Sequence, residues 1–310
     1  MVSASAPGKL ILFGEHAVVF GEPALSVAIN LRIIIEVSPS DRNELDGMPL
    51  TRGRHPYLEA TLRRAQSDQP ISLSIRSEIP QASGMGSSAA VTSSLLACLQ
   101  ALKGSLDRES IARIAFEVEY EVQGRASPID TTTATHGGGI LLLREKGEDF
   151  LWEIEKGDSV WFLHGCSLPE MTLVVGSTGL EAATGPLVAG VKALFEREEA
   201  ARRAIRRIGE ISLEGMDALR HRDLSLAGKL MGENHDLLNS LEVGHPMLEE
   251  FVQASLPYSY GAKMTGAGGG GSMIALTDRP NRVKEAIEAC GGEAFIVTTE
   301  PKGVVLEPSI

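Results

Sequence analysis

The stretch that most constrains this chain is a short glycine- and serine-rich loop between two regular segments. An alternating run at residues 71–79 precedes the loop and indicates a strand, and the apolar segment 89–102 follows it and indicates a buried helix. Amides in the first turn of a helix have no partner inside the helix, and the helix dipole adds partial positive charge there. The loop therefore predicts an anion site, with phosphate as the natural ligand.

Glycine and small hydroxyl residues suit this role, because glycine lets the backbone approach phosphate oxygens and adopt positive φ. The hydroxyls of Ser87 and Ser88 can cap the helix or offer an oxygen to Mg²⁺. An ordinary capped helix after a glycine turn would carry the same short motif, and neither a Walker A sequence nor a dinucleotide fingerprint is present. The predicted phosphate-binding residues are Ser83, Gly84, Met85, Gly86, Ser87, Ser88 and Ala89.

Length and charge limit the remaining possibilities. A chain of 310 residues suits one large domain or two medium ones that share a cleft. Because the hydrophobic pattern resets near residue 165, we expect a division into residues 1–165 and 166–310. The net charge of −12 argues against a nucleic-acid partner, which needs clustered lysine and arginine.

The cysteines and the lengths of the apolar runs indicate where in the cell the protein is expected. Cys98, Cys166 and Cys290 are far apart and fit neither a zinc site nor a disulfide framework, which indicates reduced thiols and a cytoplasmic protein. We expect no membrane association, because the sequence has no signal-peptide pattern and no apolar run of about 18 residues.

Polar residues interrupt the apolar N-terminal block. Residues 2–13 predict a strand interrupted at Pro7-Gly8, and a turn follows it. Lys9, Glu15 and His16 are the polar residues around this strand. A lysine next to Pro-Gly is commonly a surface charge, but a lysine, a carboxylate and an imidazole this close together also suit a polar pocket.

Two acidic residues farther along are candidates for the chemistry. Residues 108–123 predict a helix whose buried face uses Ile111, Ile114, Ala115 and Val118. Acids near its C-terminus oppose the helix dipole, so we expect a cation to hold at least Glu119 in place. Asp130 precedes a threonine run, where it could be a helix N-cap or a general base held at a helix start.

A second glycine-rich stretch, residues 263–272, contains five glycines and leads into a strand at 273–276. It excludes a regular helix and favours either a flexible turn or close backbone approach to a ligand. The other expected elements are a central strand at 30–37, an exposed loop at 39–54, strands at 140–144, 171–175, 294–299 and 303–306, and helices at 56–66, 187–208, 210–241, 246–256 and 281–289.

Three segments together resemble a known family. Residues 7–19 (PGKLILFGEHAVV), 84–90 (GMGSSAA) and 263–272 (KMTGAGGGGS) are similar to the three motifs of the galactokinase, homoserine kinase, mevalonate kinase and phosphomevalonate kinase superfamily. Their order and separation extend the resemblance over nearly the whole chain. Within the superfamily the chain is most similar to the mevalonate kinases, also at residues 119–130, 187–191 and 233–238.

The resemblance implies an α+β fold of two domains with the active site in the cleft between them. The N-terminal domain would hold a βαβ unit of unusual hand, and the C-terminal domain a ferredoxin-like α/β layer. The implied activity is ATP-dependent phosphorylation of the 5-hydroxyl of (R)-mevalonate in isoprenoid biosynthesis, with Mg²⁺ as cofactor and a homodimer as the assembly.

The resemblance also implies residue roles. Lys9 would lie near the transferred phosphoryl group, and Asp130 would orient or deprotonate the acceptor hydroxyl. Ser88 and Glu119 would hold Mg²⁺. The residues at the substrate would be Glu15, His16 and Ala267.

The chain departs from the family pattern at residues 181–184 (EAAT), where an arginine often precedes the residue that matches Thr184. It also has Arg-Ala-Ser-Pro at 125–128 in place of Asn-Pro-Ser-Gly. Two alternatives to a mevalonate kinase are another small-alcohol kinase, such as a phosphomevalonate kinase, and an inactive relative that only binds the ligand. The second would lack Asp130, Glu119 or Ser88, and all three are present.

Overall fold

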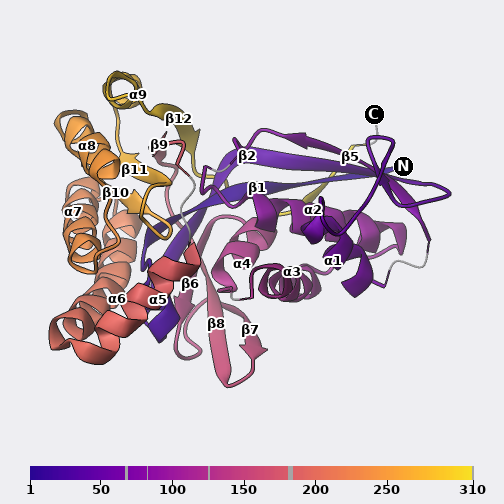
Figure 1. Cartoon of the computed structure of the whole chain (residues 1–310), viewed down its shortest axis with the longest axis horizontal. Helices are drawn as coiled ribbons and strands as arrows, with labels where there is room; N and C mark the ends of the chain where they lie inside the picture. The colour runs from indigo at the N-terminus through magenta and orange to yellow at the C-terminus, as the bar shows by residue number, and fades with distance from the viewer. Residues whose placement is uncertain (67–68, 82, 125, 181–183, 309–310) are drawn as a thin grey trace.

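A computed structural model describes residues 1–66, 69–81, 83–124, 126–180 and 184–308. These residues form a nine-stranded sheet and a four-stranded sheet with helices around both (Figure 1). The larger sheet contains β1 (Val2–Phe13), β2 (Ala24–Pro39), β3 (Glu44–Leu45), β4 (Met48–Pro49), β5 (Ile71–Ser77), β6 (Gly139–Leu143), β7 (Phe150–Lys156), β8 (Ser159–Cys166) and β13 (Val305–Glu307). The smaller sheet contains β9 (Thr172–Ser177), β10 (Gly261–Thr265), β11 (Ser272–Leu276) and β12 (Glu293–Thr298).

The long antiparallel pair β1–β2 is the centre of the larger sheet. The strand predicted at 30–37 is the second half of β2, and its central position is confirmed because β2 also pairs with β5 and β6. The predicted interruption of β1 is a shift of register between Pro7 and Gly8 within one continuous strand. The loop expected at 39–54 was wrong in part, because it contains the short pair β3–β4.

Four helices pack beside this sheet: α1 (Pro56–Arg64), α2 (Ser87–Leu102), α3 (Arg108–Gln123) and α4 (Ile129–His136) (Figure 1). The predicted start of α3 is confirmed, since the Asp107 side chain accepts a hydrogen bond of 3.2 Å from the Ser110 amide. On its buried face Ile114 is only partly buried. Phe116, which the spacing did not indicate, is fully buried.

The smaller sheet has the order β10-β11-β9-β12, and every pairing in it is antiparallel. Between β9 and β10 the chain forms α5 (Thr184–Arg197), α6 (Glu199–Arg220), α7 (Leu224–Ser240) and α8 (Pro246–Ser255), and α9 (Pro280–Ala289) connects β11 to β12. This succession of strand, helices, two strands, helix and strand is the ferredoxin-like arrangement that was expected. The single helix predicted at 187–208 was wrong, because Glu198 has an extended backbone and separates α5 from α6.

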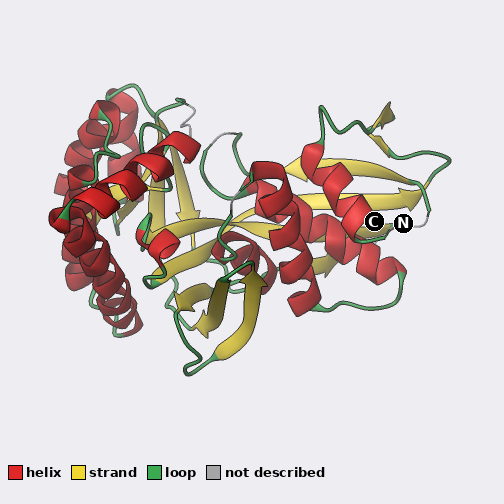
Figure 2. Cartoon of the chain, turned by 60° about the horizontal axis from the view of Figure 1, so that its bottom comes forward, coloured by secondary structure: helices red, strands yellow, loops and turns green. Residues whose placement is uncertain are grey.

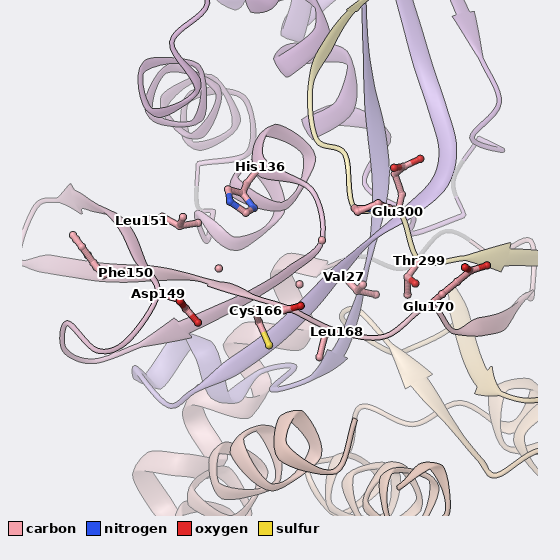
Figure 3. A pocket seen from close by; sticks show the side chains of 15 residues that line it. Val27, His136, Asp149, Phe150, Leu151, Cys166, Leu168, Glu170, Thr299 and Glu300 are labelled. Carbon is pink, nitrogen blue, oxygen red and sulfur yellow. The ribbon is translucent and has the colours of Figure 1, made fainter. Parts of the chain in front are cut away.

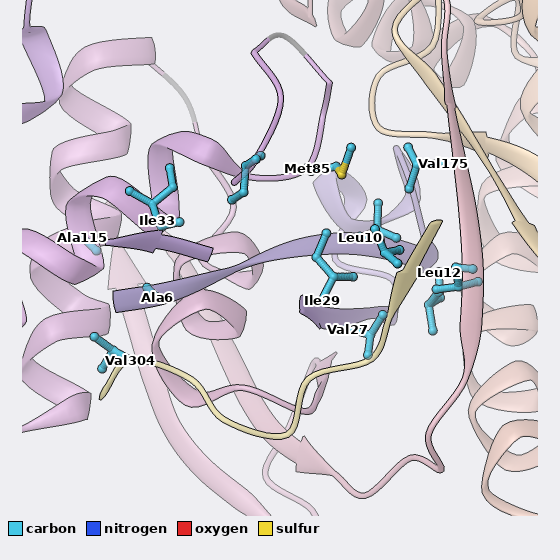
Figure 4. Close-up of a cluster of buried hydrophobic side chains, with 14 of the residues drawn as sticks. Ala6, Leu10, Leu12, Val27, Ile29, Ile33, Met85, Ala115, Val175 and Val304 are labelled. Atoms are coloured by element: carbon cyan, nitrogen blue, oxygen red, sulfur yellow. The ribbon is translucent and has the colours of Figure 1, made fainter. Parts of the chain in front are cut away.

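The chain changes sheets between β8 and β9, beside the expected boundary at residue 165. It returns to the larger sheet at its end, where β13 pairs with β1, and both ends of the chain lie far from α7 and α8 (Figures 1 and 2). The division into two domains stays a prediction. One buried apolar cluster joins the sheets, with Leu10, Leu12 and Ile29 of the larger sheet near Val175 of β9 (Figure 4).

Among the described residues, no helix has both the length and the apolar character that crossing a bilayer requires.

Candidate active site

The predicted phosphate loop ends in the open N-terminus of α2. Gly86 is the N-cap residue with φ of 76°, no side chain caps the helix, and the first turn holds no acidic residue. Gly84 also has positive φ, 69°. The first-turn amides, the hydroxyls of Ser87 and Ser88 and the helix dipole therefore form an environment suited to an anion.

The other loop residues hold its shape. The Ser83 hydroxyl donates to the Pro80 carbonyl oxygen at 2.7 Å, and the Ser83 carbonyl oxygen accepts from the Ser272 hydroxyl at 2.8 Å. The Met85 side chain is buried in the core, and its carbonyl oxygen accepts from the Lys9 amide at 2.9 Å. The Ala89 methyl is buried too, so Ala89 can bind a phosphate only through its backbone amide.

Lys9 and Asp130 form an ion pair beside the loop. Lys9 Nζ lies 2.7 Å from Asp130 Oδ2, and the two side chains are 7% and 25% exposed. Asp130 lies in the first turn of α4, whose N-cap residue is Pro128, so the alternative of an Asp130 N-cap was wrong. The other oxygen, Asp130 Oδ1, is buried without a hydrogen-bond partner among the described residues, which leaves it able to accept a proton from a ligand.

Glu119 of α3 lies near this ion pair and next to Ser88 of the loop. Its Oε1 accepts from Ser88 Oγ at 3.4 Å and from Gln123 Nε2 at 3.2 Å. Burial raises the pKa of the Glu119 carboxyl to about 8, the nearby Asp130 carboxylate adds to the shift, and Lys9 opposes it. Lys9 acts on Glu119 only through its charge, and Glu119 forms no ion pair with a described residue, so the expectation that a cation holds Glu119 stays a prediction.

The residues at this position fit a magnesium ion. Glu119 Oε2 is buried without a hydrogen-bond partner among the described residues, and the neighbouring Ser88 hydroxyl is a second hard oxygen ligand. The described chain has no cluster of three His, Cys, Asp or Glu residues able to hold a metal alone. That matches Mg²⁺, which takes one or two protein ligands and completes its shell with water and phosphate oxygens.

The turn after β1 faces the same site. His16 has φ of 60° and ψ of −41°, a positive-φ conformation that is rare outside glycine, and the Ala267 carbonyl oxygen lies 2.9 Å from its Nε2. Burial lowers the pKa of His16, and its contact with Ala267 and the charge of Glu15 oppose that shift. Glu15 is buried and forms an ion pair with Lys263 of β10.

The second glycine-rich stretch therefore contacts both other motifs. In addition to the Ser272–Ser83 bond, the Thr265 hydroxyl donates to the Ile11 carbonyl oxygen at 3.0 Å. A side chain at Gly268 would place its Cβ 2.0 Å from the Val243 carbonyl oxygen. Close backbone packing, and not a flexible turn, explains at least this glycine.

Two adjoining cavities contain these groups. The first, of about 560 Å³, is lined by the phosphate loop together with Lys9, Glu119, Asp130, His16 and Ala267. The second, of about 740 Å³, shares Glu119 and Asp130 with the first and extends to Arg144 and Lys156. The shared acids connect a phosphate side to a roomier side that could receive an acceptor.

A third cavity lies elsewhere, between His136, Cys166 and Glu300 (Figure 3). Its volume of about 580 Å³ is similar, but it contains none of the predicted site residues. The convergence of the polar groups, and not cavity size, therefore locates the candidate active site.

Sequence reasoning did not single out several of the residues that complete the site: Tyr57, Gln123, Arg144, Lys156 and Lys263. Lys263 stands within a recognised motif, but its partner is 248 residues away in the chain. Gln123 occurs one helical turn after Glu119, a spacing that could have suggested it. The departures at Arg125 and at residues 181–183 lie outside the described residues.

Comparison with known proteins places these features in context. Residues 56–138 match the GHMP kinases N terminal domain, and residues 216–296 match the GHMP kinases C terminal domain. The mevalonate kinase of Archaeoglobus fulgidus is 35% identical over 98% of this chain and 99% of its own length. That of Pyrococcus horikoshii is 32% identical over 99% of this chain and 98% of its own length.

Solved structures agree with these matches. The chain resembles the crystal structure of L. major mevalonate kinase in complex with R-mevalonate with a TM-score of 0.82, at 26% identity over 96% of both chains. It resembles the Methanococcus jannaschii mevalonate kinase with a TM-score of 0.79, at 25% identity over 96% of this chain and 98% of that one.

Proposed function

Since this chain belongs to the mevalonate kinases, within the GHMP kinases, we propose how its residues divide the work of ATP-dependent phosphorylation of mevalonate. The observation that carries the proposal is the 2.7 Å pair of Lys9 and Asp130 beside the open N-terminus of α2. The γ-phosphoryl group of ATP passes to the 5-hydroxyl of (R)-mevalonate, and the products are ADP and 5-phosphomevalonate.

The triphosphate binds along the loop from Ser83 to Ala89, with its oxygens toward the backbone amides and the hydroxyls of Ser87 and Ser88. Phosphoryl transfer needs little covalent help from a protein, so positioning and neutralisation of charge supply most of the catalysis. Lys9 supplies a positive charge close to the reacting oxygens.

Ser88 and Glu119 would hold Mg²⁺ through oxygen atoms, and a bound ion would supply positive charge to offset that of the phosphates. Before the ion binds, Glu119 is largely protonated near neutral pH, because its pKa is about 8. Loss of that proton turns Glu119 into the anionic ligand that the metal requires.

Asp130 orients the acceptor hydroxyl and accepts its proton, through the buried Oδ1 that has no partner among the described residues. Lys9 holds the other oxygen, Oδ2, and so fixes the direction of the carboxylate. Glu15, His16 and Ala267 form the wall at the acceptor.

The second cavity receives the rest of the acceptor, and Arg144 on its wall is suited to the mevalonate carboxylate. Arg144 already pairs with Glu22 at 2.6 Å, and Lys156 with Glu117 at 2.7 Å. Because both cations among the described residues of this wall are matched by carboxylates, the cavity suits a monoanion better than an acceptor that already carries a phosphate.

The experiment that tests the function is a coupled assay of ADP release with ATP and either mevalonate or phosphomevalonate, with the phosphorylated position assigned by phosphorus NMR. We expect turnover with mevalonate and phosphorylation at C5. Turnover with phosphomevalonate alone would make the chain a kinase for the next intermediate and would contradict the proposal.

The base role of Asp130 is tested by Asp130→Asn, which keeps the size of the side chain and removes the charge. We expect kcat to fall by orders of magnitude, with little change in the affinity for ATP. If kcat stays within about tenfold of the wild-type value, which is about 1.4 kcal/mol of barrier, Asp130 is not the base.

We also propose that the enzyme works as a homodimer, and that it is cytoplasmic because its three cysteines are unpaired. Sedimentation equilibrium of the purified full chain would show about twice the monomer mass of 33.0 kDa. A single species at the monomer mass over the working concentration range would contradict the dimer.

A further inference from the structure

One ion pair lies completely inside the molecule, between the two sheets. Lys263 of β10 and Glu15 of the turn after β1 are in contact through Nζ and Oε1, and both side chains are 0% exposed. Lys263 Nζ also donates to the Met264 carbonyl oxygen at 2.7 Å. Removing two charges from water is costly, and a pair of this kind usually stabilises a fold no better than apolar side chains of similar size would.

The position of the pair suggests a reason for its presence. Glu15 directly precedes His16, which has a strained positive-φ backbone, contacts Ala267 and lines the cavity at the proposed acceptor position. Strained residues of this kind persist only where the surrounding structure holds them. The contacts that hold the turn come from β10 and the glycine stretch after it, through Lys263 on Glu15 and Ala267 on His16.

Glu15 has one oxygen left. Its Oε2 is buried and has no hydrogen-bond partner among the described residues, while Oε1 is held by Lys263. Glu15 also belongs to the lining of the phosphate-side cavity. Fixing one oxygen of a carboxylate sets the direction of the other, in the same way that Lys9 fixes Asp130.

We propose that Lys263 is a positioning residue for phosphoryl transfer, whose buried ammonium fixes Glu15 and the His16 turn in the conformation that receives the acceptor alcohol. The inference rests on the proposed function and adds a residue that never touches the substrate. Lys263 acts from the second sheet on a turn of the first sheet, so it also fixes how the two walls of the site meet.

The proposal is tested with Lys263→Met, the double variant Lys263→Met with Glu15→Met, and the control Thr265→Val. The control removes one hydrogen bond between the same two segments without changing charge. For each variant, kcat, the KM for mevalonate, the KM for ATP and unfolding in urea are measured. Turnover of mevalonate by the wild type alone tests the proposed function. The further inference is tested by the ratio of each variant's kcat/KM and stability to those of the wild type.

We expect Lys263→Met to lower kcat/KM for mevalonate about 100-fold, the size of effect that a displacement of about 1 Å in a reacting group can cause, and to leave the KM for ATP nearly unchanged. It also destabilises the fold, because Glu15 is then buried without its partner. The double variant regains stability, because no unpaired charge remains, but does not regain activity. Thr265→Val stays close to the wild type in activity.

If the double variant regains both stability and kcat/KM, the pair is only structural and the proposal is wrong. Equal losses in Thr265→Val and Lys263→Met would overturn it as well, because any contact between the two segments would then suffice.

Discussion

At the scale of single residues, Lys9, Asp130 and Glu119 lie close enough together for their charges to interact. Lys9 pairs with Asp130, while burial raises the pKa of Glu119 to about 8 and the charge of Asp130 adds to that shift. Glu119 is therefore largely protonated near neutral pH in the free protein. In the proposed mechanism it gives up this proton when a cation binds.

The raised pKa of Glu119 predicts that binding of MgATP at pH 7 releases about one proton from its carboxyl group. Calorimetry in two buffers with different ionisation enthalpies measures the release, and Glu119→Gln should abolish it. A wild-type enthalpy that does not depend on the buffer would contradict the raised pKa. The free protein also loses stability as pH rises from about 4.5 to about 8, because the folded state holds this proton and the unfolded chain gives it up.

At the scale of elements, the N-terminus of α2 and the strand β1 fit together through one glycine. A Cβ at Gly86 would lie 2.6 Å from Lys9 Cγ, and the φ of Gly86 is positive. Glycine at this position therefore serves two purposes: it allows the left-handed cap, and it leaves room for the lysine beside the phosphate loop.

Comparing Gly86→Ala with Gly104→Ala distinguishes the need for a left-handed backbone from the need for space beside Lys9. Gly104 has nearly the same φ, 77°, but a methyl group there would meet no atom within 4 Å. Each substitution should cost roughly 1–2 kcal/mol of stability for the left-handed backbone. Gly86→Ala alone should lower kcat by more than tenfold and raise the KM for ATP, because Lys9 is displaced. Similar activity in both variants, measured in the ADP-release assay, would show that Lys9 has room to adjust.

At the scale of the whole molecule, the two sheets share a core and are connected in both directions. The second sheet follows the first along the chain, and β13 then returns to β1. Arg32 of β2 donates to the Gly303 carbonyl oxygen at 2.7 Å and Val304 is fully buried, so the returning segment is held before β13 begins. We expect the two halves to unfold together for this reason.

Val304→Ala tests this coupling, with Leu306→Ala as the control because Leu306 is 45% exposed. The first should lower the free energy of unfolding by roughly 1–3 kcal/mol, and the second by less than about 0.5 kcal/mol. Hydrogen exchange should show reduced protection of both β1 and β9 in Val304→Ala. Loss of protection in β1 alone would mean that the halves are independent folding units.

Much of the fold was predictable from the sequence because its signals are local. The alternation in residues 71–79, the β-branched run in β2 and the Asp107 cap each depend on neighbours a few positions away. Where local signals were weak, the prediction was wrong: the extended backbone at Glu198 divides an amphipathic stretch that reads as one helix. The short β3–β4 pair was missed for the same reason, since a strand of two residues is too short to show an alternation of apolar and polar side chains.

The sequence by itself also indicated which residues could do the chemistry, since three motifs carry Lys9, Glu15 and the glycines in a recognisable order, and Glu119 and Asp130 lie between the second motif and the third. Only the tertiary structure decided their partners: Asp130 for Lys9, Ala267 for His16 and Lys263 for Glu15. These contacts join residues that lie far apart along the chain. Charge, burial and direction at such a site are properties of the folded surroundings, and no local pattern encodes them.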